Sequence, residues 1–381
     1  MRARGAIVIA AFVLAGCGGS TPTAAHVSPT TSTAPATASA SASTGTTPAS
    51  TPTSGPPSLV HCAGAVPAGD NLVIGTVVGD PTVVVRDIQD PANAKNVCTF
   101  DASAQSPLFI SGTSIAYENA ANQIIKADVA SGATTVLAAY SSGGQYAISP
   151  DGSAVTYLDG GAWHLAKGST NKLLTTLPAV PARGIDPSQD DLYLSFSPDG
   201  NYVALFQTLR TGGSGETAAD QIRKASDGSL VYSTSGMTMA VWASVPSRLF
   251  FRDMSGNVHR WDPSSGLSSM TTLHWIRPRS SPDGRWIAYT FPTTSGVDGV
   301  GFYSVQANSQ QNTSPPGRSG AVFLTNDLVW YAGEKPCSTC FGGLPTASGV
   351  TYIYSIAGAS EITSRLASVN DAWPRVTAPG L

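Results

Sequence analysis

Cys337 and Cys340 form the sequence Pro-Cys-Ser-Thr-Cys, and two residues between a pair of cysteines is a spacing that redox and zinc sites use. A redox site of this kind needs a helix N-terminus to stabilise the thiolate, but the residues that follow, 341–349, are rich in Gly and include a Pro. A zinc ion would need two further ligands, and no His lies nearby in the sequence. We therefore expect a disulfide that closes a loop, with no metal ion or other cofactor.

Cys17 is the second cysteine with predictable chemistry. Arg2 and Arg4 precede an apolar run at 6–14, too short for a comfortable membrane span, and the sequence Leu-Ala-Gly-Cys ends at Cys17. This arrangement resembles a bacterial lipoprotein signal, in which cleavage leaves a diacylated cysteine as the new N-terminus. We expect residues 1–16 to be a signal peptide, and palmitate-type chains on Cys17 to hold the protein on the extracytoplasmic face of the cell membrane. An ordinary secretion signal is the alternative.

The other four of the five cysteines suit two disulfides, because exported proteins fold in an oxidising compartment. Cys62 and Cys98 flank a group of strand-like segments at 71–103, and the natural pairing is Cys62–Cys98 and Cys337–Cys340. The first disulfide would clamp the N-terminal entry of the folded domain onto these strands.

The remaining polar residues predict no catalytic group. His164 and His259 fall in third strands of their blades, where they would not easily converge with a carboxylate at the mouth of the central channel, and a satisfied or exposed histidine is the default interpretation. Asp190 and Asp191 stand just before a predicted strand and suit a loop cap better than acid–base work. The chain has no G-x-S-x-G sequence, so the elbow of a serine hydrolase is missing. No catalytic, cofactor-binding or metal-binding residue is nominated, and catalytic activity stays an open question.

Composition divides the chain into three parts. Residues 18–58 are almost entirely Ser, Thr, Ala, Pro and Gly and contain no charged residue, so we expect 17–58 to be a disordered tether between the signal peptide and a domain at 59–381. The formal net charge is −3 and no basic run occurs, which argues against nucleic acid as a partner. We expect a monomer.

The domain carries a repeated phrase that predicts its fold. Ser-Pro-Asp-Gly occurs at Ser149–Gly152, Ser197–Gly200 and Ser281–Gly284, and strand-like segments rich in β-branched and aromatic residues follow it. Pro fixes φ for the second position of a type I turn, and Gly accepts the left-handed conformation that follows. The intervals between the Asp residues are 48 and 84 residues, and a period of roughly 40 to 50 residues is typical of a β-propeller blade.

Degenerate copies of this turn complete the count. Pro246, Ser247 and Arg248 stand where Pro-Asp-Gly is expected in the 84-residue gap, and two further copies flank the clear repeats at 109–119 and 323–333. We expect four-stranded blades near 107–140, 145–178, 190–233, 237–274, 276–315 and 320–367.

The seventh blade is predicted to use both ends of the domain. The segment 71–103 supplies three strands but no innermost strand, and Ala372–Leu381 has the pattern of the missing one. Pairing of these segments would close the ring and remove its free edges. We therefore expect an all-β, seven-bladed propeller, with six or eight blades as alternatives.

These repeats resemble the TolB-type, WD-like β-propeller repeat of exported bacterial proteins, over about residues 107–380. The resemblance implies a propeller that acts as a binding or scaffold module in the cell envelope, with another envelope protein or polymer as its partner. The alternative is a propeller enzyme, a hydrolase or lyase acting on cell-wall glycan or another exported polymer.

Two further expectations concern surfaces. Trp163, Trp261, Trp286 and Trp330 occur at strand positions, where packing between sheets explains them better than a sugar platform does. Long connections at 207–221, 291–301 and 332–349 all leave second strands of blades, so they should emerge on the same end of the propeller. Because loops carry function more often than strands do, we expect the binding surface at that end.

Overall fold

The structure is a computed structural model that describes residues 55–67, 72–77, 80–90, 94–141, 145–177, 192–211, 215–218, 220–234, 237–243, 247–253, 255–270, 275–336 and 345–371. The chain divides into two units, Met1–Pro52 and Thr53–Leu381, and every described residue belongs to the second. The described residues form strands and turns, and no helix among them has the length and apolar character of a membrane span.

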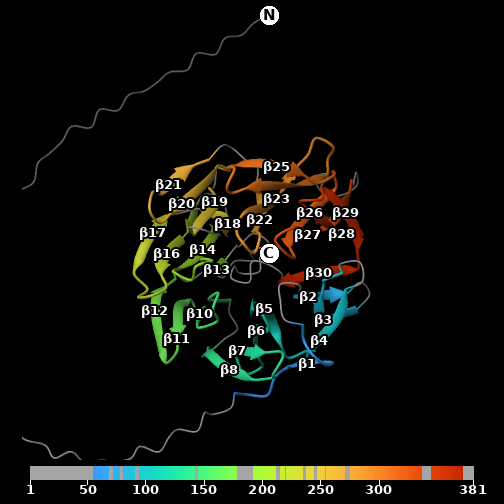
Figure 1. The fold of residues 1–381 in the computed structure, drawn as a ribbon. Helices are drawn as coiled ribbons and strands as arrows, with labels where there is room; N and C mark the ends of the chain where they lie inside the picture. The colour runs from blue at the N-terminus through green and yellow to red at the C-terminus, as the bar shows by residue number, and fades with distance from the viewer. Residues whose placement is uncertain are drawn as a thin grey trace, which may run out of the picture. The chain divides into compact units, whose positions relative to one another are not determined.

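The strands form seven sheets arranged in a ring, which is a seven-bladed β-propeller (Figure 1). Each of the six blade ranges expected from the sequence corresponds to one sheet. We number these sheets blades 1 to 6 in chain order. Blade 1 comprises β5 (Gln105–Ser111), β6 (Ser114–Glu118), β7 (Gln123–Asp128) and β8 (Thr134–Ala139). Blade 2 comprises β9 (Tyr146–Ile148), β10 (Ala154–Asp159), β11 (Ala162–Lys167) and β12 (Thr170–Thr176). Blade 3 comprises β13 (Leu192–Phe196), β14 (Tyr202–Thr211), β15 (Gly215–Ala218), β16 (Asp220–Lys224) and β17 (Leu230–Thr234).

The second half of the ring repeats the same plan. Within each of these blades, successive strands are antiparallel neighbours, as in a meander. Blade 4 comprises β18 (Thr238–Ala243), β19 (Arg248–Arg252), β20 (Val258–Asp262) and β21 (Gly266–Ser269). Blade 5 comprises β22 (Ile276–Ser280), β23 (Trp286–Pro292), β24 (Asp298–Ser304) and β25 (Ser309–Thr313). Blade 6 comprises β26 (Arg318–Phe323), β27 (Leu328–Lys335), β28 (Thr346–Ser355) and β29 (Ser360–Ser364).

Blade 7 is built from both ends of the domain, as predicted. Its strand order is β1-β4-β3-β2-β30, from β1 (Val60–Cys62), β2 (Leu72–Val77), β3 (Asp80–Asp87), β4 (Lys95–Phe100) and β30 (Leu366–Asp371). In Figure 1, β30 lies beside β2 although almost the whole domain separates them in sequence.

The position of the closing strand was predicted wrongly. The strand that pairs with β2 is Leu366–Asp371, whereas the sequence pattern favoured Ala372–Leu381, which lies outside the described residues. The segment Leu366–Asp371 carries no Pro-Asp-Gly turn, so its pattern gave no signal. It continues directly from blade 6, because only Arg365 separates β29 from β30. The outermost strand, β1, was likewise not expected as a strand.

The hydrophobic core is divided into seven layers, and each layer lies between two neighbouring blades. One cluster, for example, joins Leu165 of blade 2 to Leu194 and Phe196 of blade 3. The cluster between blades 6 and 7 contains Leu324 together with Leu366 from the closing strand. Burial of apolar area is therefore continuous around the ring, and each blade depends on both neighbours for its core.

The repeated turns have one detailed geometry. In the turn of blade 3, the Gly200 N–H donates to the Ser197 carbonyl at 2.8 Å, and Gly200 has a φ of +70°. The Ser197 hydroxyl donates to Asp199 Oδ1 at 2.6 Å and accepts the Tyr202 N–H at 2.9 Å, while Asp199 Oδ1 also accepts the Asn201 N–H at 3.0 Å. Equivalent bonds occur in the turns of blades 2 and 5. Ser and Asp are thus repeated because they satisfy the backbone donors that the turn leaves free.

Candidate functional site

The two ends of the propeller differ in the connections they carry. In a four-stranded meander, the turns between strands 1 and 2 and between strands 3 and 4 emerge at one end, and the other connections emerge at the opposite end. We call the first end the turn face, defined by the turns Ser149–Gly152, Ser197–Gly200 and Ser281–Gly284. We call the second the loop face, defined by the connection 293–297 and by the strand ends at Lys335 and Thr346.

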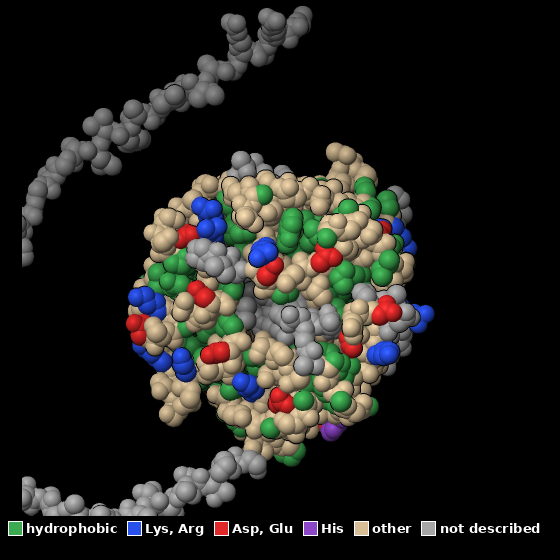
Figure 2. All heavy atoms as spheres, in the orientation of Figure 1, with side chains coloured by type: hydrophobic (Ala, Val, Ile, Leu, Met, Phe, Trp, Pro, Cys, Tyr) green, Lys and Arg blue, Asp and Glu red, His purple; other side chains and the backbone are tan. Residues whose placement is uncertain are grey.

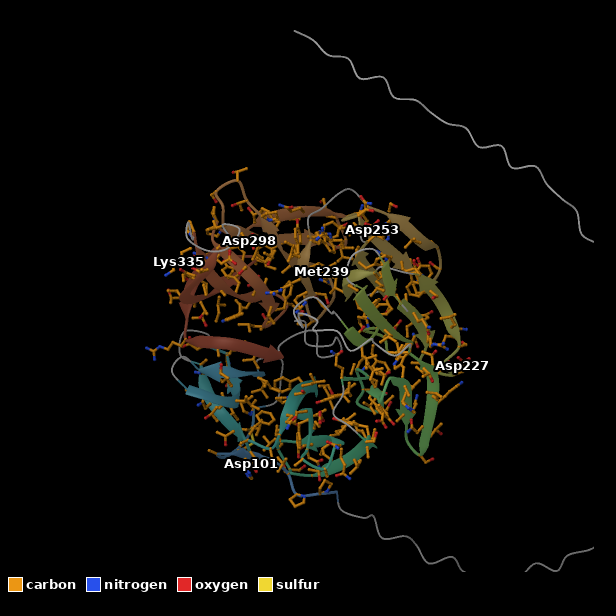
Figure 3. The ribbon with its side chains drawn as sticks, turned by 180° about the vertical axis from the view of Figure 1, so that it is seen from behind. Asp101, Asp227, Met239, Asp253, Asp298 and Lys335 are labelled. Atoms are coloured by element: carbon orange, nitrogen blue, oxygen red, sulfur yellow. A yellow bond between two sulfur atoms is a disulfide. The ribbon has the colours of Figure 1, made fainter. Side chains whose placement is uncertain are left out.

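The loop face carries the three long connections that the sequence singled out, and much of each is strand rather than loop. β14 extends to Thr211 and pairs with the additional strand β15, while β27 and β28 continue to Lys335 and from Thr346. Asp298 lies at the start of β24, and its N–H donates to Glu334 Oε2 of blade 6 at 3.1 Å. Figure 3 shows Asp298 and Lys335 over neighbouring blades.

Asp298 has an unusual electrostatic environment for a surface carboxylate. Burial and the nearby Glu334 raise its pKa above the ordinary value, and Arg277 acts in the opposite direction. Glu334 links blades 5 and 6 through two hydrogen bonds. Its side chain accepts the Asp298 N–H, and its own N–H donates to the Gly317 carbonyl at 2.9 Å. These groups are engaged in holding two blades together, so they form a structural cluster.

The described cavities open on the turn face, not on the end where we expected the binding surface. The first, which we call hollow A, has a volume of about 460 Å³ and lies between blades 2 and 3. Its lining combines two carboxylates, two ammonium groups, an amide and several hydroxyls from the turns of both blades. The lining residues are Ser149, Pro150, Asp151, Ser153, Ala154, Lys167, Phe196, Asp199, Gly200, Asn201, Tyr202, Lys224, Ala225 and Ser226.

The carboxylates of hollow A are held as anions. Burial raises the pKa of Asp151, but the hydroxyls of Ser149 and Ser153 and the Ser153 N–H donate to it and bring its pKa down to about 2. Burial acts in the same direction on Asp199, and the hydrogen bonds from Ser197 and Asn201 outweigh it, so the pKa of Asp199 is also lowered. Both groups are therefore fixed acceptors at neutral pH.

A second cavity, hollow B, has a volume of about 880 Å³ and is lined in blade 4 by Arg248, the first residue of β19. It extends from the turn of blade 3 to that of blade 5, and its lining includes two arginines. The lining residues are Pro198, Arg248, Pro282, Asp283, Gly284, Arg285, Val305 and Gln306. Pro198 lines hollow B and Asp199 lines hollow A, so the two cavities lie on either side of the turn of blade 3.

Neighbouring blades brace the rims of these cavities. Lys126 of blade 1 donates to the Gly152 carbonyl in the turn of blade 2 at 3.4 Å, and Asn326 of blade 6 accepts the Asp283 N–H in the turn of blade 5 at 2.9 Å. Figure 2 shows that acidic and basic side chains are interspersed on the face it draws, without a patch of one sign. The arrangement suits recognition of a polar ligand by fixed groups.

The predicted cysteine sites have different outcomes. Cys62 of β1 and Cys98 of β4 are cross-strand partners and form the predicted disulfide. Cys17, Cys337 and Cys340 lie outside the described residues, so lipidation and the second disulfide stay predictions. In the part of the chain that the structure describes, no group of three or more His, Cys, Asp or Glu side chains is placed to hold a metal ion.

The tryptophan interpretation agrees with the structure, and so does that of His259, whereas His164 has a buried Nδ1 without a hydrogen-bond partner. His164 stacks on Tyr157 with ring centroids 5.1 Å apart in blade 2, and His259 Nε2 lies 2.9 Å from Asp253 Oδ2 in blade 4. Trp163 and Trp261 are buried between blades, and Trp286 and Trp330 pack against neighbouring clusters. Asp190 and Asp191 lie outside the described residues.

Sequence reasoning did not predict the cavities of the turn face, although a signal for them was in the repeat. The Ser and Asp of each phrase were interpreted only as turn formers, and the change from Asp-Gly to Ser247-Arg248 only as degeneration. A comparison of the charges in the repeated turns would have shown that the turn of blade 4 carries a positive charge, Arg248, whereas the turns of blades 2, 3 and 5 carry a negative one.

Comparison with known proteins supports the fold and does not indicate a function. No protein-family model and no curated protein matches the chain. Among solved structures, it is similar to an oligogalacturonate lyase from Vibrio parahaemolyticus, with 10% sequence identity and a TM-score of 0.51 over 78% of this chain and 85% of that chain. A second oligogalacturonate lyase, in complex with manganese, is 11% identical with a TM-score of 0.49 over 79% of this chain and 85% of that chain.

TolB from Acinetobacter baumannii is 19% identical, with a TM-score of 0.40 over 66% of this chain and 65% of that chain. At these identities a likeness extends to the fold alone. Seven sheets in a closed ring make the chain a seven-bladed β-propeller.

Proposed function

We propose that this chain is an extracytoplasmic lipoprotein whose propeller acts as a binding or scaffold module of the cell envelope. The observation that carries the binding role is the pair of polar hollows on either side of the turn of blade 3, whose rims are fixed by hydrogen-bonded turns. Their volumes, about 460 and 880 Å³, fall in the usual range for ligand sites. The partner is another envelope protein or a polymer.

The location rests on two supports. The sequence at 1–17 has the features of a lipoprotein signal, with Cys17 as the site of lipid attachment. The Cys62–Cys98 disulfide is consistent with folding in an oxidising compartment. A lipid anchor on Cys17 would keep the propeller at the outer surface of the membrane that it is exported across.

The electrostatics of hollow A favour binding over acid–base catalysis. A general acid or base works best with a pKa near the operating pH, whereas hydrogen bonds hold Asp151 and Asp199 as anions far below neutrality. Such carboxylates serve well as fixed acceptors for hydroxyl or amide groups of a ligand. The hydrolase or lyase alternative has no comparable geometric support.

The binding role is tested with a photo-crosslinking residue in the full-length protein, expressed in its own envelope. Placed at Asn201 on the turn face, the probe should form a discrete covalent adduct with an envelope component. The matched probe at Ser295, exposed on the loop face, should not. Adducts from Ser295 but not from Asn201 would show that the opposite end carries the binding surface.

The anchor is tested by cell fractionation of Cys17→Ser. The parent protein should sediment with membranes, and the variant should be released in soluble form or accumulate as an uncleaved precursor. A mature variant that stays membrane-bound like the parent would contradict lipid attachment at Cys17.

A further inference from the structure

We propose that hollow B contains an oxyanion subsite formed by Arg248 and Arg285, and that its ligand is an acidic oligosaccharide with carboxylate or phosphate groups. This inference rests on the proposed binding role of the turn face and names the chemical class of its ligand.

The subsite lies where one blade departs from the repeat. Blades 2, 3 and 5 place Asp and Gly at the third and fourth positions of the turn, but blade 4 places Ser247 and Arg248 there. The substitution removes a negative charge and adds a positive one. Because the turns of blades 3 and 5 line the same cavity, the hollow over blade 4 receives a cation between two acidic turns.

Arg248 is held in place while part of its guanidinium stays available. Its Nε lies 3.1 Å from Asp262 Oδ2, and Asp262 is buried and also accepts the Ser264 hydroxyl at 2.6 Å. The two terminal nitrogens of Arg248 donate to no group among the described residues, and the side chain is 27% exposed. One edge of the guanidinium is therefore anchored, and the other faces the cavity that Arg248 lines.

Arg285 supplies a second, mobile guanidinium from the rim of the same cavity. Its side chain is 75% exposed, and its Nε lies 3.6 Å from Asp283 Oδ2, which is longer than a hydrogen bond. Asp283 is already engaged by the Ser281 hydroxyl at 2.7 Å. A ligand anion can thus recruit Arg285 without breaking a hydrogen bond of the turn.

A third arginine adds to the positive potential beneath the hollow. Arg260 lies on β20, next to the strand that carries Arg248, and its Nε is buried without a hydrogen-bond partner. Burial raises the pKa of Tyr303 to about 12, and Arg260 and Arg248 act in the opposite direction, which places both cations near that hydroxyl.

The chemistry of both hollows points to an acidic oligosaccharide. Guanidinium groups match the paired oxygens of a carboxylate or phosphate. Hollow A, on the other side of the turn of blade 3, is lined by two carboxylates, the ammonium groups of two lysines, hydroxyls and the Asn201 amide, groups that can pair with sugar hydroxyls. An extended ligand can therefore place hydroxyls in hollow A and an anionic group in hollow B.

The experiment measures binding of three probes of equal length to the full-length protein by isothermal titration calorimetry. The probes are a mannuronate oligomer with carboxylates, a glycerol phosphate oligomer with phosphates, and a neutral maltose-type oligomer. At least one anionic probe should bind, more weakly as salt rises, and the neutral probe should bind less well. The anionic probe that binds identifies the natural group as carboxylate or phosphate.

Variants locate the binding. Arg248→Gln should weaken the anionic probe by about tenfold, and the exposed Arg285→Gln by about threefold, with Arg248→Lys in between because charge is kept but the planar fork is lost. Arg277→Gln, an exposed arginine on the loop face, is the matched control and should bind like the parent. Arg285→Gln touches no buried partner, so it tests the subsite even if Arg248→Gln fails to fold.

Three results would overturn the inference. Binding of an anionic probe that Arg277→Gln reduces as much as Arg285→Gln would place the subsite elsewhere. Failure of every probe at millimolar concentration, or binding of an acidic peptide such as hexaglutamate in their place, would remove the acidic oligosaccharide as the ligand. Binding of the neutral probe alone, unaffected by either arginine, would leave the turn face as a binding surface and remove only the oxyanion subsite.

Discussion

Blade 7 and blade 3 reach the same four-stranded core by opposite routes. Blade 3 is one continuous segment whose innermost hairpin is organised by Ser197 and Asp199 within a single turn. Blade 7 has no such turn, and its innermost pair joins β2 to β30 from the two ends of the domain. Local hydrogen bonds therefore define one blade, and long-range pairing defines the other.

Each route has its own reinforcement. Blade 7 gains an extra outer strand, β1, which the Cys62–Cys98 disulfide ties to β4. The segment before β1 also contacts blade 1, where Thr134 Oγ1 donates to the Pro56 carbonyl and the Leu59 N–H donates to the Tyr117 hydroxyl at 3.1 Å. The N-terminal entry thus links blade 7 to blade 1 on the outside of the ring, while β30 closes the inside. Closure depends on contacts that span the domain, so its loss should cost more than loss of any turn.

The largest effect is expected from deletion of Leu366–Leu381. This change removes β30, exposes the edge of β2 and empties a place in the cluster between blades 6 and 7, where Leu366 is 1% exposed. The loss should exceed the roughly 5 kcal/mol upper range of a single core truncation, and aggregation should increase. Chemical denaturation and light scattering measure both effects.

A shorter deletion, 372–381, keeps β30 and serves as the control. It should retain cooperative unfolding close to that of the parent, because the described closing strand ends at Asp371. If the short deletion is as damaging as the long one, the closing strand extends beyond β30 as the sequence pattern favoured.

The disulfide should have the next largest effect. Cys62 and Cys98 are 36 residues apart, so in the loop-entropy model their bond stabilises the fold by about 3–4 kcal/mol. Cys98→Ser should therefore lower the melting temperature clearly under oxidising conditions. Cys340→Ser, which would open only the short Cys337–Cys340 loop, should lower it less, and the reverse order would contradict the role of β1 as a clamp.

Breaking a local turn should cost less. The Ser197 hydroxyl is buried, and Ser197→Ala removes the side-chain acceptor of the Tyr202 N–H and one of the donors to Asp199, at a cost of about 1–3 kcal/mol. Ser226→Ala changes an exposed hydroxyl at the rim of hollow A and should be nearly neutral in urea unfolding. Equal effects of the two substitutions would mean that the hydroxyl of the repeat is not structural.

The smallest effect is a pH dependence carried by the turns. The pKa of Asp151 is lowered from 3.8 in the unfolded chain to about 2 in the folded protein. Its contribution to stability is therefore complete above the pKa of the unfolded state and is lost as pH falls through the pKa of the folded state. The stability difference between the parent and Asp151→Asn should therefore shrink between about pH 4 and pH 2. Ser149→Ala removes a donor to Asp151 and should reduce the same acid-range slope. A difference that stays constant across this range would mean that the carboxylate is not held as an anion by the turn.

The sequence by itself was enough for the repeat, the blade ranges and the Cys62–Cys98 pairing, because each depends on residues close together or on a pattern that recurs. Pro, Asp and Gly restrict a turn wherever they occur, and a period of about one blade length is visible without knowledge of any contact. The packing of Trp163 and Trp261 followed from their strand positions in the same way.

Only the tertiary structure decided which residues close the ring and where cavities open. β30 pairs with β2 because of its place after blade 6, and nothing in its own composition distinguishes it from another short strand. The hollows form between turns of different blades, so Arg248 and Arg285 come together through the spacing of blades 4 and 5 around the ring. A single turn specifies its own backbone, whereas a binding surface on a propeller is a property of neighbouring repeats.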